Sequence, residues 1–157
     1  MALTFASVAS AAEADLGTTL TVEVGDRGPQ TWIYVLNEGS ADLTLGDVAM
    51  RNTTSTDYKV VIATAGTLIP AIRVVGVAQH TIAAGYYGFV LQRGIGTIQV
   101  GSGAGISDVD ALTTGGVAAG SVIAFAAGTT ATACVFGIAV ATTSASGTGN
   151  AFFDCRG

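Results

Sequence analysis

A stretch of 43 consecutive residues, from Ala111 to Phe153, contains no Asp, Glu, Lys or Arg. Gly, Ser and Thr interrupt it too often for a membrane-spanning helix, which needs about 20 mostly apolar residues in a row. Over the whole chain only 11% of the 157 residues are charged, against about 25% in an average soluble domain. We therefore expect neighbouring subunits to cover part of the surface. The alternative is a monomer whose Thr- and Ser-rich face is soluble without charge.

The charged and nucleophilic residues argue against several classes of function. Six Lys and Arg in a chain of net charge −5 are too few to neutralise a nucleic-acid backbone. The single histidine, His80, stands in a predicted loop without the partners that a catalytic triad or a metal site requires. Asp108 and Asp110 lack the glycine and glutamate of a calcium-binding loop, and we interpret them as a capped turn. The sequence predicts no catalytic residue, no metal and no cofactor, and therefore no enzyme.

Short strands separated by Gly-rich turns dominate the pattern. Residues 18–24 alternate apolar and polar side chains, and residues 31–36 return after a turn to complete a hairpin. Residues 107–112 are the one internal stretch that favours a helical turn, with Ser107 as its cap. About eight to ten short strands predict an all-β fold, a small barrel, β-tulip or sandwich. Further strands are expected at residues 58–63, 72–78, 86–92, 96–100, 121–125, 133–141 and 151–155.

Two segments of the chain resemble each other. Residues 76–94 and 137–157 both begin with Gly-(Val/Ile)-Ala, contain a Gly-rich turn and end with an apolar pair before Arg-Gly. Their offset is 61 residues at the start and 63 at the end, which predicts a pair of similar hairpins, residues 73–94 and 134–157. Chance similarity in a chain rich in Gly and Ala is the alternative.

We divide the chain into an N-terminal arm, residues 1–17, and a single β domain, residues 18–157. The Ala-rich arm is expected to dock on its own oligomer or on a partner. The alternative is a short surface helix packed on its own domain.

Two cysteines lie in the C-terminal part. Cys134 and Cys155 would face each other if the last hairpin folds about residue 145, because both are equally distant from its centre. That geometry would permit a disulfide bond. We expect two reduced, buried thiols instead, the state favoured in a bacterial cytosol.

Three segments carry a resemblance to tailed-phage virion proteins: residues 73–94, 116–123 and 136–140. They read Gly-x-Ala followed by Gly-x-x-Gly-Phe-Val, then Ala-Ala-Gly-Ser-Val, then Gly-Ile-Ala. The chain resembles the capsid decoration, or cement, proteins over about half its length. The resemblance implies homotrimers on the outer capsid surface of the virion that clamp neighbouring major capsid protein subunits. The N-terminal arm would then add a strand to the edge of a capsid sheet.

The aromatic and apolar residues of the arm and the strands are the candidate contacts. We expect them to fill a core or a subunit interface rather than to stack on a ligand. Two alternatives remain: another virion part, such as a head fibre, tail or baseplate component, and a carbohydrate- or receptor-binding β-sandwich with aromatic rings stacked on sugars. The predicted interface residues are Leu3, Phe5, Val8, Trp32, Tyr34, Tyr86, Tyr87, Phe152 and Phe153.

Overall fold

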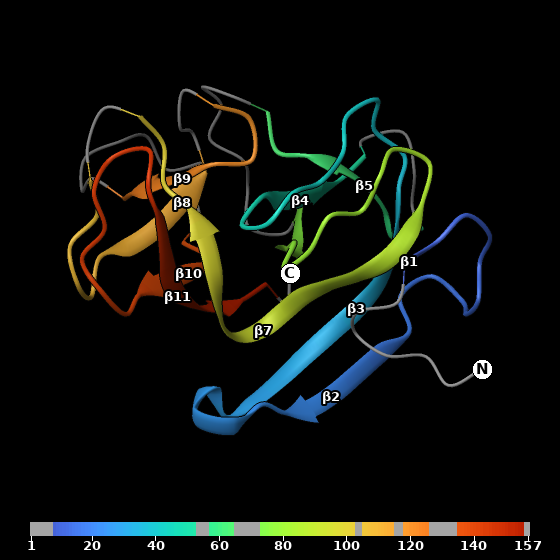
Figure 1. Ribbon diagram of the computed structural model, residues 1–157, viewed down its shortest axis with the longest axis horizontal. Coiled ribbons are helices and arrows are strands. Elements are labelled where there is room, and N and C mark those ends of the chain that lie inside the picture. Colours follow the sequence, from blue (N-terminus) through green and yellow to red (C-terminus); the bar gives the residue numbers. More distant parts are fainter. Residues whose placement is uncertain are drawn as a thin grey trace.

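The computed structural model describes residues 8–52, 57–64, 73–102, 105–114, 118–125 and 135–155. Within these ranges the chain forms eleven strands in one hydrogen-bonded sheet and a single short 3-10 helix, which confirms the expected all-β class (Figure 1). The elements are β1 (Val8–Ala9), β2 (Thr19–Glu23), η1 (Gly25–Arg27), β3 (Pro29–Asn37), β4 (Val48–Arg51), β5 (Lys59–Ile62), β6 (Val74–Val77), β7 (Tyr87–Gln99), β8 (Ala111–Thr114), β9 (Val122–Ala124), β10 (Gly137–Ala139) and β11 (Thr148–Asp154).

Five strands close into a first small barrel. Strand β3 pairs in parallel with β5, β5 with β4, β4 with β6, β6 with β7, and β7 returns antiparallel to β3. Because side chains alternate along a strand, Ile33 and Val35 of β3 share one face while Trp32 and Tyr34 share the other. The first face belongs to an apolar cluster made of Ile33, Val35, Leu43, Ala49, Val60, Val75, Ala78, Ile82 and Val90.

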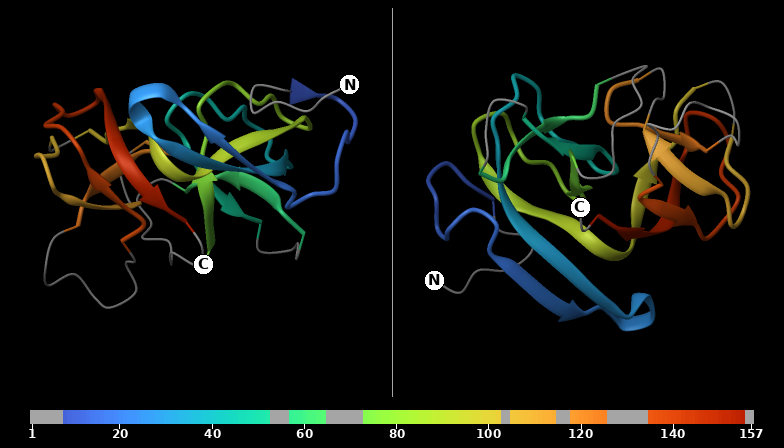
Figure 2. Two further views of the ribbon diagram at one scale, coloured as in Figure 1. Left: turned by 90° about the horizontal axis from the view of Figure 1, so that it is seen from below. Right: turned by 180° about the vertical axis from the view of Figure 1, so that it is seen from behind.

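A second barrel uses the far half of β7. There β7 pairs with β11, β11 with β10, β10 with β8 and β8 with β9, and a parallel bridge between Val100 and Val122 closes the ring. Figure 1 shows β7 as a long curved ribbon that runs from one group of strands to the other. The view from behind shows the two groups on either side of this strand, with the β2–β3 hairpin extending away from both (Figure 2).

The two barrels repeat each other strand for strand. Residues 29–51 correspond to residues 92–114 at an offset of 63, and residues 74–93 correspond to residues 135–154 at an offset of 61. We call residues related in this way equivalent. Three equivalent pairings are Leu36–Tyr87 with Gln99–Thr148, Ala49–Gly76 with Leu112–Gly137, and Leu43–Ile82 with Ile106–Thr143.

Three local predictions differ from the structure. The strands expected at 86–92 and 96–100 form one strand, since Gly94 adopts a φ of +120° that lets β7 bend without breaking. Residues 107–110 form a turn before β8 rather than a helical turn capped by Ser107. The carboxylate of Asp110 accepts a hydrogen bond from the Ser107 N–H at 2.7 Å, so the capping runs in the opposite direction. Strand β4 lies in a segment for which no strand was expected.

The arm docks on its own domain over the residues that the structure describes. Val8 and Ala9 pair antiparallel with Gly88 and Tyr87 of β7, and the Glu13 N–H donates a hydrogen bond of 3.2 Å to the Tyr34 hydroxyl. Residues 8–9 of the arm therefore form a strand that pairs within the same chain, and residues 8–17 contain no helix of the kind that the alternative assumed. Leu3 and Phe5 lie outside the described residues.

The last hairpin turns about residue 145, close to the midpoint between Cys134 and Cys155. Its register pairs Gly137 with Phe153, so continuing it brings residue 135, rather than residue 134, opposite Cys155. Cys155 is a free, buried thiol. Burial, together with the neighbouring Asp154 carboxylate, raises the pKa of this thiol, so it is protonated and unreactive at neutral pH. Cys134 lies outside the described residues.

Candidate interaction surface

Three of the predicted interface residues lie inside the protein. Trp32, Tyr34 and Phe153 are no more than 3% exposed and belong to the apolar cluster that joins the two barrels. Tyr34 packs against Tyr87 and Phe89, with ring centroids 6.1 and 5.0 Å apart. Their burial leaves these three side chains almost no surface for another molecule. It also removes Trp32 and Tyr34 as stacking platforms for a sugar.

Three other predicted residues gather at one end of the first barrel. Val8 and Tyr86 are exposed, and Tyr87 is half-buried beside Tyr34. The β1–β7 pairing brings the arm next to the Tyr86–Tyr87 pair, as Ala9 lies opposite Tyr87. The interface role of these residues stays a prediction. Phe152 does not join them, because it belongs to β11 in the second barrel.

Sequence reasoning missed the apolar residues that surround Phe152. Ile138 lies directly opposite Phe152 across the β10–β11 ladder, so their side chains share one face. Val135 and Val140 flank Ile138 and, like it, are exposed. We call these four residues, Val135, Ile138, Val140 and Phe152, the C-terminal patch; each is 38–48% exposed. The sequence shows that Val135, Ile138 and Val140 are apolar but contains no signal that they are exposed.

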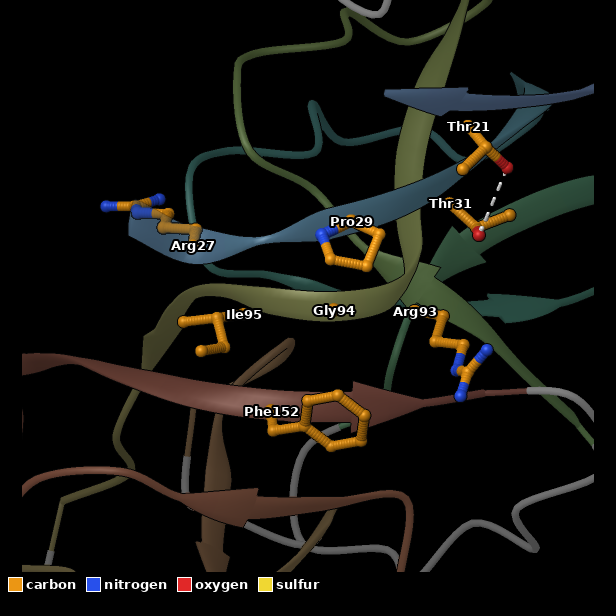
Figure 3. A pocket seen from close by; sticks show the side chains of 8 residues that line it. All are labelled: Thr21, Arg27, Pro29, Thr31, Arg93, Gly94, Ile95 and Phe152. Carbon is orange, nitrogen blue, oxygen red and sulfur yellow. Dashed lines mark hydrogen bonds between the residues drawn. The ribbon is translucent and has the colours of Figure 1, made fainter. Parts of the chain in front are cut away.

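A pocket of about 350 Å³ borders the C-terminal patch (Figure 3). It lies between the β2–β3 hairpin and strands β7 and β11, and Phe152 forms part of its wall. Arg93 lines it and forms an ion pair with Asp154, with 3.8 Å between Nε and Oδ2. The pocket offers apolar surface beside guanidinium groups and hydroxyls, which suits binding rather than acid–base chemistry. Its lining residues are Thr21, Arg27, Pro29, Thr31, Arg93, Gly94, Ile95 and Phe152.

His80 lines a separate cavity of about 270 Å³ together with Trp32, Leu45 and Gln79. Its Nε2 atom is buried and has no hydrogen-bond partner among the described residues. Burial lowers the pKa of this histidine, since the charged imidazolium would lose its hydration. The side chain is therefore neutral at pH 7 and has the role of a packed loop residue.

The stability of the fold is expected to decrease as the pH falls through the ordinary histidine range. The unfolded chain takes up a proton at His80 below about pH 6.5, whereas the folded chain resists it until a lower pH. The contribution of neutral His80 to the free energy of unfolding is complete above about pH 6.5. It is lost as the pH falls toward the lower pKa of the folded chain. Urea unfolding of wild type and His80→Gln between pH 7 and pH 5 measures it. The variant should lose part of this pH dependence, and identical profiles would contradict the assignment.

Over the described ranges, no group of three or more His, Cys, Asp or Glu side chains comes together to hold a metal ion. Nor does any helix in those ranges have the length and apolar character to cross a membrane.

Comparison with known proteins shows a likeness to a solved structure. No family model and no curated protein matches this chain. Among solved structures, the head fiber gp8.5 N base of bacteriophage phi29 matches with a TM-score of 0.55 and 17% sequence identity. The match covers 79% of this chain and 95% of the phage domain. The chain therefore shares its fold with the base domain of a phage head fibre.

Proposed function

We propose that this chain is a structural protein of a tailed-phage virion and that it attaches to the outside of the head. The observation that carries the proposal is the fold likeness to the head fiber gp8.5 N base, which extends over nearly all of that domain. The resemblance of residues 73–94, 116–123 and 136–140 to capsid decoration proteins supports the same location. Two features of different kinds therefore favour a head-bound protein.

The first role we propose is that of a decoration protein that clamps neighbouring major capsid protein subunits. Exposed apolar side chains and few charges suit a protein that acts through buried contact area. Attachment as a homo-oligomer, with a trimer as the expected form, would add several individually weak contacts to one shell and hold firmly through multivalency. No catalytic step is part of this role.

A second role is the base of a head fibre. The structural neighbour is named as the base of a head fiber, which favours this role. In this role, the present fold would be the base from which a further protein segment or a partner protein projects. The two roles differ in what their loss does to the head. A clamp helps the shell to resist internal DNA pressure, so its loss weakens the head. A fibre base does not strengthen the shell, so its loss leaves the strength of the head unchanged.

Deletion of the gene from the phage that encodes this chain tests the location and separates the two roles. Cryo-electron microscopy of the mutant virions should show density missing from the head exterior. For a clamp, heads of the mutant should release their DNA at a lower temperature than wild type; for a fibre base, projections disappear while the release temperature is unchanged. Supplying the chain in trans should restore the density. Purified virions that lack the chain, or carry it only on the tail, would refute the proposal.

A further inference from the structure

Three of the four residues of the C-terminal patch are exposed at positions whose equivalents in the first barrel are buried. Val135, Ile138 and Phe152 are equivalent to three residues that are at most 2% exposed, namely Val74, Val77 and Leu91. The chemistry at these positions is apolar in both barrels. The difference therefore lies in what covers the face, not in the residues that form it.

The chain itself covers the face of the first barrel. Val77 and Leu91 belong to the same apolar cluster as Ile98 and Phe153 of the second barrel. Gln79, next to this face, holds the backbone of Thr97 with two hydrogen bonds: its Nε2 donates to the Thr97 carbonyl at 2.9 Å, and the Thr97 N–H donates to its Oε1 at 2.8 Å. These hydrogen bonds hold the second half of β7 against the first barrel.

The turns next to these faces show the same contrast. In the first barrel, Gly46 lies so close to β7 that a Cβ placed on it would stand 2.7 Å from the backbone nitrogen of Gln99. Its equivalent in the second barrel is Val109, which is 76% exposed. The equivalent of Gln79 is Val140, an exposed apolar residue of the C-terminal patch. Among the residues that the structure describes, no further strand covers this apolar face of the second barrel.

We propose that a second copy of this chain covers the C-terminal patch. In the first barrel, the equivalent apolar face packs against another part of this same chain. This precedent favours a copy of the chain as the occupant. Charge favours it as well. The patch has no ionisable side chain, and the Arg93–Asp154 ion pair at its margin is internally neutral. Two chains of net charge −5 meet there with little repulsion. The inference refines the proposed function by naming one partner and one surface.

Sedimentation velocity of the purified full-length chain, from low micromolar to several hundred micromolar, tests this inference. The wild type should sediment as a multimer of the 15.5 kDa chain. Ile138→Glu and Phe152→Glu, examined separately, should each raise the dissociation constant at least about tenfold, because each buries a charge in the interface. Both positions are exposed in the single chain, so the variants should fold, and the fluorescence of the single Trp32 in the core reports this.

Leu45→Asp is the matched control. Leu45 is 45% exposed, lies outside the patch and is equivalent to Asp108, so the turn accepts an aspartate at that position. This variant should associate like wild type. The inference is overturned by a wild type that stays monomeric throughout, by patch variants that associate normally, or by a control that dissociates as they do. A wild-type monomer found on phage heads would point to a capsid partner for the patch and would leave the proposed function standing. A multimer absent from virions would remove the function and leave the interface.

Discussion

Replacement of Gly46 by alanine is expected to lower the free energy of unfolding by about 3–5 kcal/mol. Gly46 has a φ of +89°, a conformation that costs a residue with a side chain about 1–2 kcal/mol. The added methyl group would also stand 2.7 and 2.8 Å from backbone atoms of Gln99 and Ile98. Backbone atoms in a paired strand cannot move aside cheaply. The turn must therefore separate from β7, and the contact between the two barrels is lost.

Val109 at the equivalent position provides the control for this prediction. It also has a positive φ, +64°, which is unfavourable for a β-branched side chain. Since this side chain is exposed, Val109→Gly removes strain and little packing, and it should raise the free energy of unfolding by about 0.5–1 kcal/mol. Urea unfolding followed by Trp32 fluorescence measures both variants. A loss of stability in Val109→Gly, or no loss in Gly46→Ala, would contradict the predicted difference between the two turns.

Phe153→Ala is expected to destabilise the protein by about 3–5 kcal/mol, the usual cost of removing a buried aromatic ring. Phe153 is fully buried and stacks on Phe136, with centroids 6.3 Å apart and planes inclined by 17°. It lies opposite Gly94, where β7 bends, and opposite Gly137 on the other side of β11. Glycine on both sides leaves room for the ring, and these two glycines have no side chain that could fill the cavity that alanine would create.

Phe152→Ala, one residue earlier, should behave differently. Its side chain points to the opposite face of β11 and is 38% exposed, so the free energy of unfolding of the single chain should change by about 1 kcal/mol or less. Its effect should appear in association instead. Thermal and urea unfolding of both variants, at matched concentrations below the wild-type dissociation constant, separate the two residues. Similar losses of stability would mean that the two phenylalanines do not face opposite sides of β11.

The strands near the ends of the chain could be read from local pattern. Alternation in residues 18–24, together with the turn that follows them, places the β2–β3 hairpin correctly, because a strand with one buried face has a period of two in the sequence. The location of β4 could not be predicted in this way, since its four residues have no clear alternation and are held by β5 and β6, which come later in the chain.

The candidate interaction surface could also be predicted from the sequence only in part. Aromatic residue types identify large apolar side chains but not which of two adjacent ones faces inward, so Phe152 and Phe153 could not be separated without the register of β11. The apolar positions of the C-terminal patch are visible in the sequence, but their exposure is not. Val77 and Ile138 are similar residues at equivalent positions, and only the presence or absence of a covering unit distinguishes them.

The sequence by itself determined the all-β class, the shortage of charge and the hairpins, because these depend on residue type and on spacing over a few positions. Tertiary structure alone decided that β7 runs through two barrels and that the N-terminal segment pairs with it. It also decided that one apolar face is buried while its equivalent stays open. Such outcomes depend on contacts between segments tens of residues apart. Burial is a property of the neighbours that a side chain meets, and local spacing does not record which neighbours those are.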